Sequence, residues 1–308
     1  MRLLLSLLLL TLLVACAETP ELGDCKLTPV TKMSLQRRGG LLITQVGING
    51  QWARMIVDTG AERTTLSTQA AERLKLGRDL NRVMRSVGVG GASQNADAVV
   101  DGVVLGGVRF PLERVAVGTL NMGDTADGLL GADVLLAFEM DIDVPENLVT
   151  LYRVRRCLDA RPSWTEPYLE ITGVSARKDR LLVPFELDGA SGTAIVDTGA
   201  EATVIGVQMA RRMGLTEQSM SMDRVVHLRG AGAGTATARL HWFRQLRIGP
   251  AVRQGLMLTV MPTDVGVGDA LIGQDFLRDR RVWMSFPTRR FFVSRLAHEI
   301  TPPVRPQP

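Results

Sequence analysis

The chain has 308 residues, 45% of them hydrophobic and 22% charged, which is enough for one large domain or two ordinary ones. Its formal net charge is +4, and no run of basic residues with interleaved aromatic residues occurs, so nucleic-acid binding has little support. We interpret the 32 arginines against 4 lysines as overall composition and solvated surface rather than as a polyanion site.

The N-terminal segment, residues 1–16, is predicted to be a signal peptide outside the fold. After Arg2 an apolar run extends to Ala15, which is too short to span a membrane and has the length of a signal-peptide core. The run ends in LVAC, which resembles a bacterial lipobox, where the cysteine, here Cys16, is lipidated and becomes the first mature residue. Ala17 follows it, which points to the outer membrane; an ordinary signal cleaved near Ala17 is the alternative.

The three cysteines agree with export. If Cys16 carries a lipid, Cys25 and Cys157 remain as an even pair, which can form a disulfide in an oxidising periplasm. Two buried free thiols are the alternative. No CxxC motif and no cysteine–histidine cluster occurs, so the sequence predicts no metal site, and nothing in it calls for a cofactor.

A β-rich lobe is predicted over residues 36–156, after an N-terminal tether over residues 17–35. It opens with LLITQVGINGQWARMIVDTG, which is typical of a strand, a hairpin turn at Asn49-Gly50 and a second strand. The stretch TQAAERLKL then has the apolar spacing of a helix. A glycine-rich stretch, SVGVGGASQNADAVV, and further short strands complete the lobe.

An interlobe linker is predicted over residues 157–170, which contain two prolines and no clear period. Residues 171–298 then repeat the first lobe, with a hairpin turn at Asp188-Gly189, a helical stretch VQMARRMGL and a glycine-rich stretch within VVHLRGAGAGTATARL. The proline-rich tail, residues 299–308, is predicted to be disordered.

An internal repeat relates the two lobes. Shifted by 139 positions, IVDTGAERTTLSTQAAERLKLG from Ile56 matches IVDTGAEATVIGVQMARRMGLT from Ile195 at twelve of twenty-two positions. A second pair, DGLLGADVL from Asp127 and DALIGQDFL from Asp269, follows at nearly the same offset. Because these features and the glycine-rich stretch between them recur in the same order, the chain contains two copies of one domain of roughly 130 residues.

The repeated Asp-Thr-Gly-Ala resembles the active-site motif of aspartic peptidases. The later hydrophobic-hydrophobic-Gly segments look like the family element that packs under the active-site loop, and their residues are Leu129, Leu130, Gly131, Leu271, Ile272 and Gly273. Alanine after each glycine is closer to the retropepsin branch than to pepsins, and no tyrosine matches the pepsin flap. The resemblance implies an all-β fold of two pseudo-twofold-related acid-protease β-barrel lobes in one chain, each with a short helix.

The resemblance also implies a catalytic dyad of Asp58 and Asp197. Two carboxyl groups about 3 Å apart cannot both ionise, so they share a proton and supply the base and the acid of peptide hydrolysis. Their titration belongs to the pair, so the sequence does not say which one holds the proton. The residues expected to support the dyad complete each motif: Thr59, Gly60, Ala61, Thr198, Gly199 and Ala200.

Each supporting residue type has its own expected role. The glycines allow a sharp turn and offer N–H groups to the carboxylates, and the threonines bond to the opposite loop. The alanines lack a hydroxyl group that would stabilise an ionised carboxylate, so we expect the dyad to titrate higher than in a pepsin. The predicted activity optimum is mildly acidic to near neutral, and a rate profile that peaks below about pH 3 would contradict it.

Two glycine-rich hairpins are predicted to be mobile flaps that bind substrate. Their tip residues are Gly88, Val89, Gly90, Gly91, Gly230, Ala231, Gly232 and Ala233. A dinucleotide loop is disfavoured, because β-type alternation lies on both sides of GAGAG and no helix follows it. For Glu62 and Glu201, which follow the motifs, we favour a solvated or turn-stabilising role over substrate contact.

The sequence therefore predicts an aspartic endopeptidase of the bacterial cell envelope, facing the periplasm and held to the outer membrane by its lipid. We expect a monomer that binds a protein or peptide extended in the interlobe cleft, without nucleic acid. One alternative is a catalytically silent bilobal lipoprotein that binds peptides or regulates. Another is a structural envelope protein whose motifs only shape turns. The sequence does not give the natural substrate or the cleavage-site preference.

Overall fold

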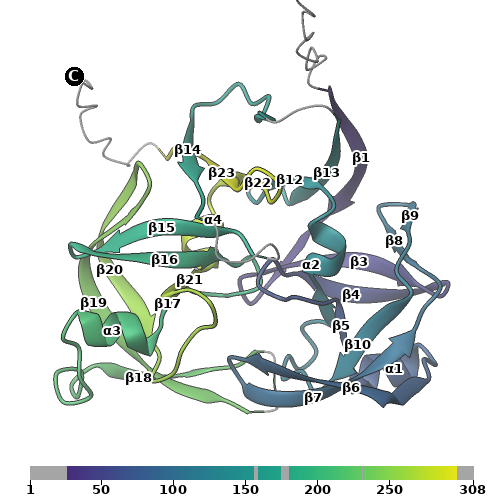
Figure 1. Cartoon of the computed structure of the whole chain (residues 1–308), viewed down its shortest axis with the longest axis horizontal. Coiled ribbons are helices and arrows are strands. Elements are labelled where there is room, and N and C mark those ends of the chain that lie inside the picture. The colour runs from purple at the N-terminus through teal and green to yellow at the C-terminus, as the bar shows by residue number, and fades with distance from the viewer. Residues whose placement is uncertain (1–25, 156–158, 175–179, 231, 233, 297–308) are drawn as a thin grey trace, which may run out of the picture.

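The computed structural model describes residues 26–155, 159–174, 180–230, 232 and 234–296. The predictions for the signal peptide with Cys16, for Cys25 and Cys157, for Ala231 and Ala233, and for the tail fall outside these residues. The described residues form 23 strands and four short helices, arranged as two facing β-lobes joined by a shared sheet (Figure 1). The predicted all-β fold of two lobes is confirmed.

The first lobe is built around one ten-stranded sheet. Its centre contains a parallel pair, β4 with β11, and a second parallel pair, β5 with β10, while β2 pairs only with β3. In sheet order the strands are β6 (Arg78–Gly88), β7 (Gly91–Val99), β10 (Arg114–Gly118), β5 (Thr65–Ser67), β11 (Gly128–Leu130), β4 (Gln51–Val57), β3 (Leu41–Ile48), β8 (Val103–Leu105) and β9 (Val108–Phe110), with β2 (Gln36–Arg38) beside β3.

The second lobe repeats this pattern in a seven-stranded sheet. Strand β15 pairs with both β16 and β19, so six of the strands close into a barrel, and β18 extends it beyond β19. In sheet order the strands are β15 (Leu182–Leu187), β16 (Ala190–Val196), β21 (Ala270–Ile272), β17 (Val204–Ile205), β20 (Ala251–Val260), β19 (Ala236–Ile248) and β18 (Arg224–Leu228).

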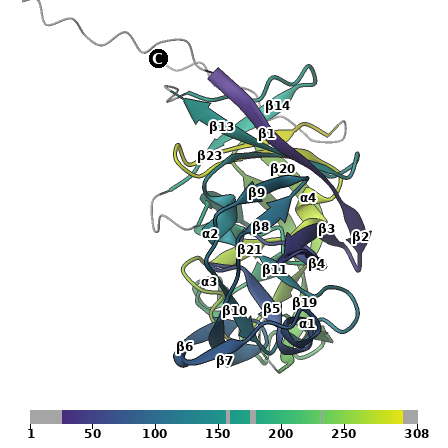
Figure 2. The same cartoon turned by 90° about the vertical axis from the view of Figure 1, so that its right-hand side faces the viewer.

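A six-stranded sheet joins the lobes, and each lobe contributes one half of it (Figure 1 and, turned by 90°, Figure 2). Strands β12 and β22 pair antiparallel at its centre, so a pseudo-twofold axis passes between them. The fully buried Met140 and Met284 face each other there. In sheet order the strands are β1 (Lys26–Ser34), β13 (Leu148–Arg155), β12 (Glu139–Asp143), β22 (Arg281–Ser285), β23 (Arg290–Ser294) and β14 (Tyr168–Thr172).

Both predicted hairpin turns are confirmed. Asn49 and Gly50 join β3 to β4 with φ values of +47° and +79°. Asp188 and Gly189 join β15 to β16 with φ values of +50° and +91°. Positive φ at both central residues matches the right-handed twist of the flanking strands, and asparagine, aspartate and glycine tolerate it best.

The four helices are short. The two predicted from apolar spacing occur as α1 (Thr68–Arg73) and α3 (Val207–Arg212), and each packs a pair of buried residues against its lobe. Two further helices, α2 (Ala132–Leu135) and α4 (Gln274–Leu277), follow the hydrophobic-hydrophobic-Gly segments. No helix among the described residues has the length and apolar character needed to cross a bilayer.

Two strands lie where the sequence predicts irregular chain. Strand β1 occupies part of the predicted tether, and β14 begins inside the predicted linker. Both are edge strands of the shared sheet, and each pairs along one side only, β1 with β13 and β14 with β23. Few of their side chains are fully buried, so the apolar alternation that marks a central strand is weak in them.

Candidate active site

The two aspartates stand at the ends of equivalent strands. Asp58 directly follows β4 and Asp197 directly follows β16. The Asp58 amide donates to Leu130 O at 3.0 Å, and the Asp197 amide donates to Ile272 O at 3.0 Å. Because β11 and β21 run parallel to these strands, each hydrophobic-hydrophobic-Gly segment supports the loop that carries an aspartate.

The two active-site loops are locked together by their threonines. Thr59 Oγ1 donates to Val196 O at 2.7 Å, and Thr198 Oγ1 donates to Val57 O at 2.6 Å. In return, each threonine hydroxyl accepts the backbone amide of the other threonine at 3.1 Å. Both side chains are buried, so these four bonds fix one loop against the other across the pseudo-twofold axis.

The motif glycines bring the two carboxyl groups together. Gly60 N and Ala61 N each donate to Asp58 Oδ1 at 2.9 Å, and Gly199 N donates to Asp197 Oδ1 at 2.8 Å. Each glycine also lies against the opposite aspartate, because a Cβ atom on Gly60 would come closer than 3.0 Å to the Asp197 carboxyl group. A Cβ atom on Gly199 would meet the Asp58 carboxyl group in the same way. Only glycine permits this arrangement.

Burial and mutual repulsion shift the titration of the dyad. Asp58 is 8% exposed and Asp197 is 9% exposed. Desolvation, followed by the charge of Asp197, raises the pKa of Asp58 well above its ordinary value, and the amides of Ala61 and Gly60 oppose this. Desolvation likewise raises the pKa of Asp197. The pair therefore holds one proton at a pH where two isolated carboxyl groups would have lost both.

An arginine distinguishes the two sides of the dyad. Arg180, with a side chain 11% exposed, forms an ion pair with Glu62 at 3.3 Å. Its charge lowers the pKa of Asp197 against the larger effect of burial. At the equivalent position of the first lobe the sequence has Leu41, and Glu201, the counterpart of Glu62, makes no ion pair within the described residues. The charge of Arg180 thus favours the ionised form of Asp197, and the first lobe has no arginine at the equivalent position.

A threonine–aspartate pair in each lobe also supports the active-site loops, and the sequence analysis does not predict it. Thr64 donates its amide and hydroxyl group to Asp133, and Thr203 does the same to Asp275. Each threonine hydroxyl also accepts the amide of the following hydrophobic-hydrophobic-Gly glycine. The repeat contains these residues at matching positions, so a search for paired polar residues in both copies would find them.

The predicted flap residues lie over the other lobe. Val89 and Gly90 form the tip of the β6–β7 hairpin, where Gly88 pairs with Gly91. Val89 packs against an apolar cluster of the second lobe that includes Ile195 and Leu271. The second flap meets it: Gly234 N donates to Gly90 O at 2.9 Å, and a Cβ atom on Gly232 or Gly230 would contact the first tip.

This arrangement can bind and activate a water molecule between two carboxyl groups of unequal charge. Such a pair supplies a base and an acid without a metal. Within the residues that the structure describes, no group of three or more histidine, cysteine, aspartate or glutamate side chains is placed to hold a metal ion.

Each lobe matches a family model, and most of the chain resembles a solved structure. Residues 44–134 match the family model for aspartyl protease, and residues 183–279 match the model for gag-polyprotein aspartyl protease. The aspartic proteinase from Irpex lacteus has a similar fold, with a TM-score of 0.54 over 89% of this chain and 98% of that chain at 14% identity. This likeness defines the fold: that of the two-lobed aspartic proteinases.

A curated relative is the DNA damage-inducible protein 1 of Eremothecium gossypii, which is 25% identical over 175 residues. The match covers 53% of this chain and 36% of that protein, so the chain spans only about a third of the relative's length. With a match in each lobe, the paired motifs and the shared fold, the chain belongs to the retropepsin-like aspartic peptidases.

Proposed function

We propose that the protein is an aspartic endopeptidase whose catalytic residues are Asp58 and Asp197. The observation that carries this proposal is the placement of the two buried carboxyl groups, each against the glycine of the opposite motif. The pKa values of both groups are raised, which favours retention of one proton on the pair. Both copies of the motif contain the aspartate and the threonine, which favours an active site over a decayed copy.

In the proposed reaction, the ionised carboxylate takes a proton from the water as the water attacks the scissile carbonyl carbon. The protonated carboxyl group donates its proton to the carbonyl oxygen, and the tetrahedral intermediate then collapses with protonation of the leaving amine. We assign the charge to Asp197, because Arg180 favours its ionised form, and the proton to Asp58. The substrate lies extended under the two flaps.

This activity is tested by digestion of a mixed peptide library followed by mass spectrometry. Cleavage should persist with a metal chelator and with a serine-directed inhibitor, and it should stop with a pepstatin-type inhibitor. Cleavage that a chelator abolishes and that a pepstatin-type inhibitor leaves intact would contradict the assignment.

We also propose that the enzyme works in the bacterial cell envelope on protein substrates, anchored by a lipid on Cys16. The support is the apolar N-terminal run that ends in LVAC. Metabolic labelling with a fatty acid, followed by membrane fractionation, should find labelled wild-type protein in the outer-membrane fraction. The Cys16→Ser variant should lose the label, and a variant that keeps it would refute the anchor.

A further inference from the structure

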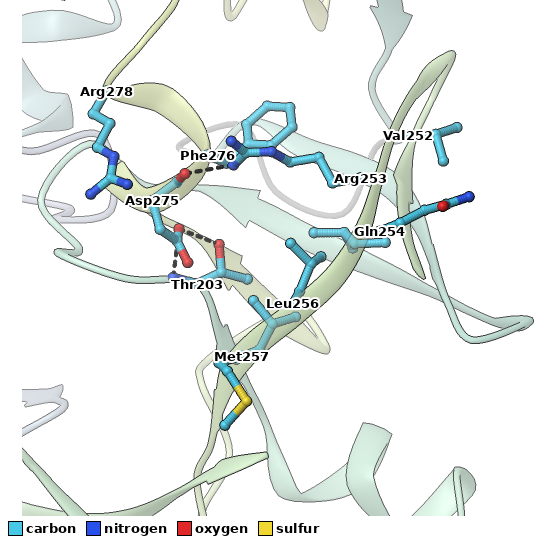
Figure 3. Close-up of a pocket in the computed structure, with 11 residues that line it drawn as sticks. Thr203, Val252, Arg253, Gln254, Leu256, Met257, Asp275, Phe276 and Arg278 are labelled. Atoms are coloured by element: carbon cyan, nitrogen blue, oxygen red, sulfur yellow. Dashed lines mark hydrogen bonds between the residues drawn. The ribbon is translucent and has the colours of Figure 1, made fainter. Parts of the chain in front are cut away.

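The second lobe has a pocket that does not belong to the dyad. It has a volume of about 450 Å³ and opens between β20 and α4 (Figure 3). Leu246, Leu256 and Phe276 form apolar parts of its lining, and Arg253 and Arg278 border it. Neither aspartate of the dyad and none of the flap-tip glycines lines it.

The first lobe fills the equivalent space. Counting from the hairpin turn, Phe110 pairs with Val103 in β8–β9 as Arg253 pairs with Leu246 in β19–β20, so Phe110 and Arg253 are equivalent. Phe110 is 7% exposed, and its ring packs edge-on against Phe138 at 5.2 Å. The two copies therefore differ here, with a buried aromatic ring in the first lobe and a guanidinium group in the second.

The guanidinium group is held at the pocket wall. Arg253 Nη1 donates to Asp275 O at 2.6 Å, and the Arg253 guanidinium lies 5.9 Å from the Phe276 ring centre (Figure 3). The Asp275 carboxylate is bonded to the Thr203 amide and hydroxyl group at 2.9 Å and 2.7 Å. The carboxylate of Asp275 is thus engaged inside the protein. Arg253 and Arg278 border the opening, and Arg278 forms an exposed ion pair with Asp279 at 3.6 Å.

The residues at the rim of the pocket also differ between the two lobes. Met257, which lines the pocket, and its cross-strand neighbour Trp242 are 50% and 54% exposed. The equivalent pair in the first lobe is Arg114 and Val99, where Arg114 forms an ion pair with Asp79 at 3.3 Å. Val99 is 59% exposed, so both lobes expose an apolar side chain at that position. The lobes differ at the other position, where the second lobe exposes Met257 and the first has an ion-paired arginine.

A strand edge lies beside the pocket. Strand β20 pairs with β17 only through Thr259 and Val260, so within the described residues its stretch from Arg253 to Leu258 has no strand on that side. An extended peptide can add to such an edge, with main-chain bonds for affinity and alternate side chains in a pocket for specificity.

We propose that this pocket is an exosite for an extended acidic segment of the protein substrate, remote from the bond that is cut. An aliphatic side chain of that segment enters the pocket, and a neighbouring carboxylate binds the guanidinium groups of Arg253 and Arg278. The inference rests on the proposed function, because an endopeptidase acts on protein chains and its substrate is therefore the ligand we expect at this pocket.

The exosite is tested first by binding, with no cleavage required. The probe is a fluorescein-labelled peptide of alternating leucine and glutamate, and the protein is the full chain with Asp58→Asn. We expect Arg278→Glu and Arg253→Phe, which restores the first-lobe residue, each to weaken binding at least about tenfold. The exposed Arg153→Glu is the matched control and should bind as before. Equal binding by all four proteins, or equal binding of a leucine–lysine peptide, overturns the exosite.

Kinetics of the active protein form the second arm. With unfolded β-casein as substrate, Arg278→Glu should raise KM about fivefold or more, while a short fluorogenic peptide that spans only the cleft is cut at the wild-type rate. Arg278 is exposed and outside the core, so this variant keeps the fold if Arg253→Phe does not. Equal losses on both substrates overturn the exosite. Peptide binding without any cleavage by the wild type supports the pocket and refutes the peptidase activity alone.

Discussion

The hydroxyl group of Thr59 has two partners in the opposite loop. It donates to Val196 O and accepts the amide of Thr198, and all three groups are buried. The family motif includes these threonines, so the sequence predicts that each one bonds to the opposite loop. It did not predict the role of Arg180 or of the Thr64–Asp133 and Thr203–Asp275 pairs, because residues distant in the sequence meet there only after folding.

Replacement of Thr59 by valine keeps the shape of the side chain and leaves a buried carbonyl and a buried amide without partners. Each unpaired group costs about 1–3 kcal/mol, so for the two groups we expect a loss in the free energy of unfolding of roughly 2–6 kcal/mol. Urea denaturation measures it. Thr59→Ser retains both bonds and is the control, and a valine variant as stable as the serine variant would show that the lock is unimportant.

Replacement of Arg180 by leucine gives the second lobe the residue that the first has at Leu41. Because the cation favours the ionised form of Asp197, its removal raises the pKa of that carboxyl group. The base must be ionised to act, so the acidic limb of kcat/KM should move to higher pH, by about half a unit to one unit.

The pH profile separates this effect from a structural one. Arg180→Lys keeps the charge and should keep the limb close to that of the wild type. A leucine variant that loses activity uniformly, with an unmoved acidic limb, would mean that Arg180 only holds Glu62 and the loop in place.

At the scale of elements, an ion pair ties the first flap to the active-site loop. Arg63 lies in that loop, and its guanidinium contacts the Asp97 carboxylate of β7 at 2.8 Å. Asp97 is 3% exposed, and Arg82 also lies 3.5 Å from its carboxylate. The second lobe has Ala202 at the position of Arg63, so only the first flap is held in this way.

A double-mutant cycle with Arg63→Met and Asp97→Asn should give a coupling energy of about 1–3 kcal/mol in unfolding experiments. Both single variants should also raise KM, because a loosened hairpin closes less often over substrate. Additive effects of the two substitutions, within about 0.5 kcal/mol, would refute the coupling.

Sequence pattern predicted the elements that have their own local signal. The hairpin turns followed from Asn49-Gly50 and Asp188-Gly189, and two helices followed from apolar spacing. Helices α2 and α4 have four residues each, which is too short for a helical period. Strands β1 and β14 depend on partners more than a hundred residues away, which no local pattern contains.

At the scale of the whole molecule, the shared sheet makes one body of two copies. Arg281 of β22 binds Asp141 of β12 through two bonds, Nε to Oδ1 at 2.9 Å and Nη2 to Oδ2 at 2.7 Å. Its guanidinium also lies 5.0 Å from the Trp164 ring centre. The Asp141 side chain is 4% exposed and the Arg281 side chain is 30% exposed, so the carboxylate of this cross-lobe pair is largely removed from water.

Replacement of Arg281 by alanine leaves a buried carboxylate without its main counter-charge, which costs about 3–5 kcal/mol. We expect a lower melting temperature and, in calorimetry, less cooperative unfolding of the two lobes. Arg278→Ala, a nearby exposed arginine, is the control and should melt within about 1 °C of the wild type. An Arg281→Ala variant that melts like this control would contradict a role for the pair in joining the lobes.

The amino-acid sequence alone predicts the duplication and, with it, the pairing of Asp58 and Asp197. It does not predict the effect of the differences between the copies, such as Leu41 against Arg180 and Phe110 against Arg253. The strand register and the surroundings of these side chains become known only from the folded structure. The features shared by both copies hold the dyad, whereas Arg180 acts on one aspartate of it and Arg253 belongs to the proposed exosite.

The most direct test of the central claim is the hydrolysis rate of the wild type, Asp58→Asn and Asp197→Asn on one peptide across the acidic to neutral range. We expect a bell-shaped wild-type profile with a mildly acidic to near-neutral optimum, and a loss of kcat of about 10³-fold or more in each variant. Turnover by either variant at the wild-type rate, or a wild-type optimum below about pH 3, would contradict it.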